Sequence, residues 1–173
     1  MKNIILIFSI YLVQFLNLSS NEPKLEEVIK GLNKPWSLSF VTETDILITE
    51  KSGSLLKVNL INKKIKKFTH NLNILEDGQG GLLEVLFDNN EIFVSFSENR
   101  GGGKSSTSVA KASITNRDLN FKNIFRAEPP INSGYHFGSR LVIKDNYLFI
   151  TVGERGKGMI AQDATMHPGS IIR

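Results

Sequence analysis

Residues 36–50 read WSLSFVTETDILITE: an apolar strand pattern, a polar turn, and a second apolar strand pattern that closes on a glutamate. The same plan recurs in residues 82–98 (LLEVLFDNNEIFVSFSE) and in residues 139–154 (SRLVIKDNYLFITVGE). The closing glutamates are spaced by 48 and 56 residues. Strand-turn-strand units that repeat about every 40 to 50 residues are typical of β-propeller blades. The repeat therefore predicts an all-β protein built from blade-like sheets.

The rest of the chain also reads as short strands separated by turn signals such as KSG, RGGGK and KDN. Further strands are predicted at LEEVI, SLLKVNL, KIKKFT, TSVAKASI, FKNIFRA and SIIR, which are residues 25–29, 54–60, 64–69, 107–114, 121–127 and 170–173. Outside the N-terminal leader, no segment of a dozen residues holds a helical period. The glycine-rich run in residues 98–108 lacks the spacing of a phosphate-binding loop, so it predicts a flexible hairpin.

Composition limits the possible classes of protein. The chain has 173 residues, of which 40% are hydrophobic and 22% charged, as expected for about one globular domain. Its net charge of +4 is spread over many lysines, which argues against a nucleic-acid partner. The absence of cysteine excludes disulfides, thiolate metal sites and cysteine nucleophiles. The lysine-rich residues 63–67 predict a solvated edge strand, because edge lysines oppose pairing between sheets.

The N-terminus has the layout of a secretory signal peptide. Lys2 precedes the apolar run IILIFSIYLVQFL in residues 4–16, and small polar residues follow. The run is shorter than the roughly 20 residues of a membrane span. We therefore expect a signal peptide at residues 1–20, a partial propeller at residues 21–173, and a periplasmic or secreted location without stable membrane insertion. The alternative is an uncleaved membrane anchor.

The chain length raises a question of closure. At about 50 residues per blade the chain supplies roughly three blades, whereas closed propellers need about four or more. Three blades alone would leave edge strands exposed. We therefore expect a fragment truncated at its C-terminus, with assembly of partial propellers into a ring as the alternative.

A series of motifs gives a specific resemblance. In chain order they are KPWSLSF, LITEKSGSLLKV, GQGGLLEVLF, FVSFSE, IFRAEPP, GYHFGSRLV, LFITVGERG and AQDATMHPGSIIR. This series resembles the first half of the soluble aldose sugar dehydrogenases, the glucose/sorbosone dehydrogenase family. The resemblance implies a six-bladed β-propeller, of which this chain covers roughly the first three blades. It also implies two cofactors, pyrroloquinoline quinone (PQQ) and calcium, and oxidation of aldose sugars to lactones by hydride transfer to the quinone.

The resemblance also implies roles for four residues. His136 falls on the family's catalytic base, a neutral imidazole suited to taking the proton of the anomeric hydroxyl near working pH. Glu154 falls on the acidic partner that holds this base in one tautomer. Gln79 falls on a glutamine that contacts the cofactor, and its amide can both donate and accept hydrogen bonds. Tyr135 falls on a cofactor contact but departs from the acidic residue of the glucose-specific branch.

Taken alone, the same residues have structural readings. His136 reads as a packed or capping histidine, and Glu154 as a solvated residue at a strand end. Gln79 reads as a turn residue among Gly78, Gly80 and Gly81, which would adopt positive φ angles. The remaining polar residues read as structural: Arg140 in a hydrogen bond, Asp163 and Gln162 bracing a loop, and His70 and His167 in turns. Three scattered histidines make a weak metal site.

Two functions remain open from the sequence. One is the PQQ-dependent sugar dehydrogenase, whose calcium ligands and cationic quinone clamps we expect beyond the end of this chain. The other is a non-catalytic propeller fragment that acts as a sugar-binding or interaction module. The sequence names neither the sugar nor the electron acceptor.

Overall fold

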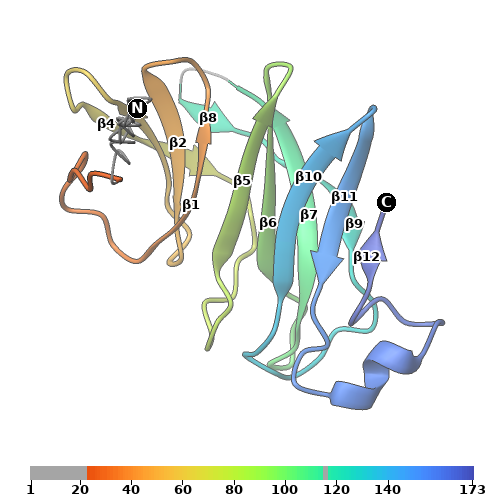
Figure 1. Ribbon diagram of the computed structural model, residues 1–173. Coiled ribbons are helices and arrows are strands. Elements are labelled where there is room, and N and C mark those ends of the chain that lie inside the picture. Colours follow the sequence, from red (N-terminus) through yellow and green to blue (C-terminus); the bar gives the residue numbers. More distant parts are fainter. Residues whose placement is uncertain (1–22, 115–116) are drawn as a thin grey trace, which may run out of the picture.

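The computed structural model describes residues 23–114 and 117–173, which form three sheets standing side by side (Figure 1). The first sheet has the order β1 (Pro35–Phe40), β2 (Asp45–Glu50), β3 (Leu55–Asn59), β4 (Ile65–His70) and β8 (Asp118–Leu119). The second has the order β5 (Leu82–Asp88), β6 (Glu91–Asn99), β7 (Ser105–Ser113) and β9 (Lys122–Arg126). The third has the order β10 (Gly138–Lys144), β11 (Tyr147–Val152) and β12 (Ile171–Ile172), and one 3-10 helix, η1 (Gly158–Gln162), precedes β12.

The predicted strands are confirmed with one exception. Residues 25–29 have irregular backbone and pair with no strand; Leu25 and Val28 are exposed, while Ile29 packs on a sheet face. Ile29 and Leu32 cover the face of the first sheet that carries Ile46 and Ile48. The two-residue strand β8, parallel to the end of β4, had no signal of its own in the sequence.

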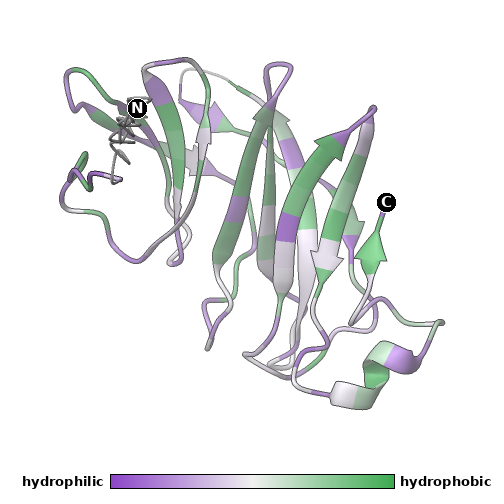
Figure 2. Ribbon diagram, viewed as in Figure 1, coloured by the Kyte–Doolittle hydropathy of each residue, from purple (hydrophilic) through white to green (hydrophobic). Residues whose placement is uncertain are grey.

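The apolar core lies between the sheets, as it does between propeller blades. Its largest cluster joins Leu47 and Leu55 of the first sheet to Val85 and Val94 of the second. A second cluster joins the second and third sheets, and it includes Val109, Leu141, Ile150 and Val152. Figure 2 shows the apolar colour running along the strands and the polar colour concentrated at the hairpin turns. The first strands β1, β5 and β10 are thereby brought next to one another (Figure 1).

Each of these first strands carries a register shift near its start. The shifts lie between Pro35 and Ser37, between Leu82 and Val85, and between Gly138 and Leu141. Such a bulge leaves a backbone N–H without its ladder partner. A hydroxyl on the second strand of each sheet accepts that bond.

The three bonds follow one pattern. Thr49 Oγ1 accepts the N–H of Ser37 at 3.1 Å, Ser95 Oγ accepts that of Glu84 at 3.1 Å, and Thr151 Oγ1 accepts that of Arg140 at 3.0 Å.

The first two of these hydroxyls also donate to the neighbouring sheet. Thr49 Oγ1 donates to the carbonyl of Leu83 at 2.5 Å, and Ser95 Oγ donates to the carbonyl of Ser139 at 2.6 Å. Both side chains are fully buried. Each hydroxyl therefore satisfies the bulge of its own sheet and binds the bulge of the next one. We call these two groups the hydroxyl bridges.

The bulges decide which of the repeated glutamates lie at the same level along the strands. Glu50, Phe96 and Val152 are the partners of the residues at which the three bulges begin, so they occupy equivalent positions on the second strands. Glu98 and Glu154 each lie two residues further along, at another equivalent position. The three glutamates therefore do not form one ring. Glu50 and Glu98 are also buried, at 8% and 7% exposed.

Both buried carboxylates have partners. Glu50 accepts the N–H of Asn33 at 2.6 Å, and Glu98 binds Arg126, Ser108 and Asn123.

Two surface predictions are confirmed. Lys66 and Lys67 are exposed on β4, which pairs with β8 only through Thr69 and His70, so this part of the strand is an edge. The glycine-rich run forms the hairpin between β6 and β7, with residues 101–103 at positive φ.

The predicted signal peptide at residues 1–20 lies outside the described residues. In the part of the chain that is described, no helix is long and apolar enough to cross a membrane.

We expect Ser95→Ala to destabilise the protein by about 1–3 kcal/mol, because it leaves a buried N–H and a buried carbonyl unsatisfied. The free energy of unfolding in urea measures this loss. Ser113→Ala, at the exposed end of β7, is the matched control and should change stability little. Equal stability of the two variants would contradict the role given to the Ser95 hydroxyl bridge.

Candidate active site

The candidate site is built from three segments that meet at one edge of the sheets, the lower edge in Figure 1. Residues 77–81 lead into β5, residues 133–137 lead into β10, and residues 153–156 leave β11. The segments are joined by backbone bonds, of which the shortest runs from the N–H of Gln79 to the carbonyl of Gly134 at 2.6 Å. Residues far apart in the sequence are thereby placed around His136.

His136 has an unusual backbone conformation, with φ at 47°. This left-handed region is unfavourable for residues other than glycine and is held by surrounding bonds. Its N–H donates to Gln79 Oε1 at 2.8 Å, and its carbonyl accepts the N–H of Arg155 at 3.3 Å. Gly153 permits the close approach, since a Cβ there would lie 1.9 Å from the carbonyl oxygen of His136.

The imidazole of His136 is hydrogen-bonded through Nδ1 to Glu154 Oε1. The same carboxylate oxygen accepts the N–H of Gly156 at 3.0 Å. The hydrogen bond from His136, followed by smaller contributions from backbone N–H groups, holds the pKa of Glu154 below its usual value. The His136 side chain is 52% exposed, and its Nε2 makes no hydrogen bond to the described residues. One ring nitrogen is thus fixed by a carboxylate while the other faces outward.

Gln79 and Tyr135 lie beside this pair. Gln79 uses its amide oxygen on the backbone of His136, which leaves its amide nitrogen without a partner in the described chain. The Tyr135 ring is 59% exposed and stands edge-on to the imidazole, with centroids 6.2 Å apart. The structure therefore brings together all four residues that the sequence nominated.

The glycines around Gln79 serve two purposes. Gly78 and Gly81 have φ of 53° and 155°, as expected from the sequence. The expectation of positive φ is wrong for Gly80, which is needed for space. A Cβ at Gly80 would lie 2.9 Å from the Phe137 ring. Residues 78–81 can therefore pack directly against the ring of Phe137, the residue that follows His136.

Arg155 is a residue of this region that the sequence analysis missed. It follows Glu154 in the sequence TVGERG, where a charged side chain reads as part of a surface turn. It is 2% exposed, and this burial lowers its pKa to about 10. Nothing local in the sequence marks it as buried.

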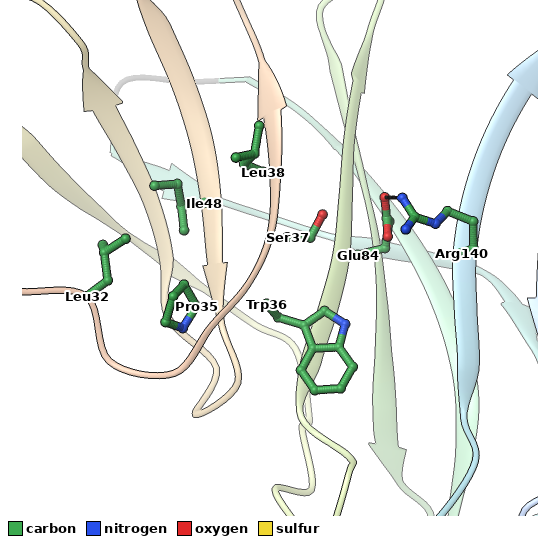
Figure 3. A pocket seen from close by; sticks show the side chains of 8 residues that line it. All are labelled: Leu32, Pro35, Trp36, Ser37, Leu38, Ile48, Glu84 and Arg140. Atoms are coloured by element: carbon green, nitrogen blue, oxygen red, sulfur yellow. Dashed lines mark hydrogen bonds and ion pairs between the residues drawn. The ribbon is translucent and has the colours of Figure 1, made fainter. Parts of the chain in front are cut away.

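Arg140 has the structural role expected of it. Its guanidinium pairs with Glu84 at 3.1 Å, while burial raises the pKa of that carboxyl group. The pair borders a groove of about 480 Å³ beside Trp36 on the first strands, and Figure 3 shows the two side chains reaching toward each other. His136 is not among the residues lining this groove.

The other nominated polar residues also have structural partners. Asp163 Oδ1 accepts the backbone N–H of Thr165 at 2.9 Å and so braces its loop. His167 Nδ1 accepts the N–H of Glu128 at 2.8 Å, and His70 Nε2 lies 2.7 Å from the carbonyl of Gly53. Among the residues that the structure describes, no group of three or more acidic or histidine side chains is placed to hold a metal.

The chain is part of a β-propeller, because its three sheets bring their first strands together as blades do. A histidine–carboxylate pair at one edge of the sheets forms a candidate acid–base site. Residues 32–173 match the family model described as Glucose / Sorbosone dehydrogenase, and the chain belongs to this family. The prediction that it covers roughly the first three blades of a six-bladed family propeller is confirmed.

Three relatives illustrate the match. Aldose sugar dehydrogenase YliI of Escherichia coli (strain K12) is 31% identical over 152 residues, which are 82% of this chain and 41% of that protein. A glucose dehydrogenase of known crystal structure is 34% identical in sequence and matches with a TM-score of 0.82. The match covers 87% of this chain and 47% of the glucose dehydrogenase chain. The PQQ-bound aldose sugar dehydrogenase of Streptomyces coelicolor shares the fold, with 22% identity, a TM-score of 0.76, and coverage of 86% and 46%. The chain thus spans less than half the length of these relatives.

The pairing of His136 with Glu154 predicts a pH-dependent stability. Because the pKa of Glu154 is lowered from 4.5 in the folded protein, its ionised form stabilises the fold above that value, and the contribution disappears as the pH falls through the lowered pKa. Wild type should therefore exceed Glu154→Gln in unfolding free energy at about pH 7, and the difference should shrink toward about pH 3.

Urea unfolding at a series of pH values measures this difference. The exposed Glu43→Gln is the control, and its curve should run parallel to that of wild type. A wild-type advantage over Glu154→Gln that is constant with pH would contradict the pairing.

Proposed function

We propose that the protein oxidises aldose sugars to lactones with PQQ as the hydride acceptor, and that His136 is the general base. The observation that carries this proposal is the pair itself: Nδ1 of His136 is held by Glu154 while Nε2 is open. A carboxylate on one ring nitrogen fixes the tautomer in which the other nitrogen can accept a proton. The family membership supports the same chemistry, since the relatives are named aldose sugar and glucose dehydrogenases.

In the proposed reaction, His136 Nε2 removes the proton from the hydroxyl on the anomeric carbon. The C–H bond of that carbon breaks as a hydride, and the carbon becomes the carbonyl of the lactone. The sugar thus loses two electrons and two hydrogens, one as the proton on His136. Glu154 stabilises the resulting imidazolium through the Nδ1–H bond. Bound PQQ would supply a quinone carbon that accepts the hydride.

The residues present fit a planar, polar quinone. Gln79, Tyr135 and His136 place an amide nitrogen, a phenol hydroxyl and an imidazole nitrogen at the same edge, and none of these groups has a partner in the described part of the chain. These groups would hold and orient the cofactor's polar rim. PQQ is named for the relative from Streptomyces coelicolor, and its assignment to this chain is part of the proposal.

Calcium does not fit the described residues in the same way. This ion takes six to eight oxygen ligands, and no cluster of acidic side chains in residues 23–114 or 117–173 could begin such a site. No step of the proposal uses calcium. The proposed assignment of residues 1–20 as a signal peptide would place the enzyme in the periplasm or outside the cell, where small sugars are accessible.

We expect the full-length protein, supplied with PQQ and calcium, to reduce an artificial electron dye when aldoses are added. His136→Ala should lower turnover by roughly 100-fold or more, the usual scale of a lost general base. The initial rate of dye reduction over a panel of aldoses measures both quantities.

His70→Ala is the matched control because His70 lies on the outer strand β4. It should retain the wild-type rate. Wild-type turnover in His136→Ala would remove the base assignment. A full-length protein that binds sugars without reducing the dye would favour a non-catalytic propeller module.

A further inference from the structure

We propose that Arg155 is a positioning residue that sets the orientation of the His136 imidazole. The expected effect on turnover rests on the proposed function. The orientation of His136 by Arg155 is argued from the structure alone. Arg155 touches no reacting atom in this proposal. It acts through the backbone on either side of His136.

The peptide group that joins Tyr135 to His136 is held from both sides. Its carbonyl oxygen accepts a bond from Arg155 Nε at 2.9 Å, and its N–H donates to Gln79 Oε1 at 2.8 Å. The φ angle of His136 depends on the peptide planes on both sides of its Cα. The preceding plane is held by Arg155 Nε and Gln79, and the following plane by the bond from the Arg155 N–H to the His136 carbonyl at 3.3 Å, so these bonds together maintain the left-handed φ of 47°.

The same guanidinium also ties this segment to the second sheet. Its two terminal nitrogens bind the carbonyl and the hydroxyl of Ser105, each at 2.9 Å, and one of them also donates to the carbonyl of Ser133. Ser105 begins β7, which belongs to the rigid middle sheet. Arg155 therefore fixes residues 133–136 relative to a strand outside the loop.

A stacking contact completes the arrangement. The guanidinium carbon of Arg155 lies 3.7 Å from the centre of the Phe137 ring, a cation–π geometry. Phe137 is 4% exposed, and Gly80 lies against its other edge. Both residues that flank His136 are thus restrained by Arg155, Tyr135 through its carbonyl and Phe137 through its ring.

The chemistry of these contacts explains why arginine stands here. All of its hydrogen-bond partners are neutral oxygens, and the carboxylate of Asp77 favours its charged form electrostatically without forming a salt bridge with it. The planar fork of a guanidinium can meet several such oxygens in fixed directions and stack on a ring at the same time. A lysine ammonium retains the charge but cannot reproduce this geometry.

Burial of a cation that has no salt bridge is costly to the fold. A residue needed only for packing at this position would be served better by an apolar side chain. The retained charge therefore serves the orientation of the carbonyls that surround His136.

The test compares Arg155→Lys and Arg155→Ala with wild type in the full-length protein. Movement of the imidazole away from Glu154 should break the hydrogen bond at Nδ1, which NMR of the ring nitrogens without sugar or cofactor detects as a changed Nδ1 signal and a changed tautomer. Turnover should fall by about tenfold to 100-fold with little change in KM, the effect of a displaced catalytic group.

Chemical rescue separates positioning from folding. Free guanidinium should restore the Nδ1 signal of His136 and turnover in Arg155→Ala, whereas methylammonium should not. Arg126→Ala is the matched control, because it removes an arginine from the buried Glu98 and so reduces stability without touching residues 133–137. It should leave the Nδ1 signal of His136 unchanged.

An unchanged Nδ1 signal of His136 in both Arg155 variants would overturn the proposal, even if both are less stable. A variant that does not fold is replaced by the other, since either one alone tests the hydrogen bond at Nδ1. If wild type itself reduces no dye, the proposed function fails, while the Nδ1 signal and its rescue by guanidinium still decide the role of Arg155.

Discussion

Two buried hydroxyl groups determine where the third sheet begins, and the candidate site depends on that placement. Ser95 Oγ donates to the carbonyl of Ser139, and Thr107 Oγ1 donates to the carbonyl of Phe137 at 2.8 Å. Both donors lie on the middle sheet and are fully buried. Because buried bonds of this kind are costly to break, the backbone on the C-terminal side of His136 is fixed to the second sheet.

The candidate site is therefore a product of contacts between sheets. The side-chain oxygen of Gln79 that accepts the N–H of His136, the carboxylate of Glu154 and the carbonyl of Gly134 come from segments that lead into or out of different strands. None of these segments could hold an imidazole in a left-handed conformation alone. A propeller suits this purpose, since its first strands gather loops from several blades at one edge.

The electrostatics of the site combine an exposed and a buried charge. Glu154 is partly exposed and keeps a lowered pKa through its bonds to His136 and to backbone N–H groups. Arg155, the next residue, is buried among neutral oxygens, and its pKa falls to about 10, still well above neutral pH. Adjacent residues thus point to opposite sides of the loop. One faces the open imidazole, and the other holds the backbone beneath it.

The sequence by itself determined most of the strands and the blade-like repeat, because alternating apolar residues and turn glycines are local features. The four residues gathered at the site followed only from the series of motifs that resembles the family, since His136 taken alone reads as a packed or capping histidine. Only the tertiary structure decided the alignment of the glutamates, the packing of residues 25–29 and the burial of Arg155. Each bulge adds a residue that strand patterns do not reveal, so Glu50 is level with Phe96 and not with Glu98. The burial of Arg155 depends on Ser105 and Phe137, which reach it only when the second and third sheets pack together.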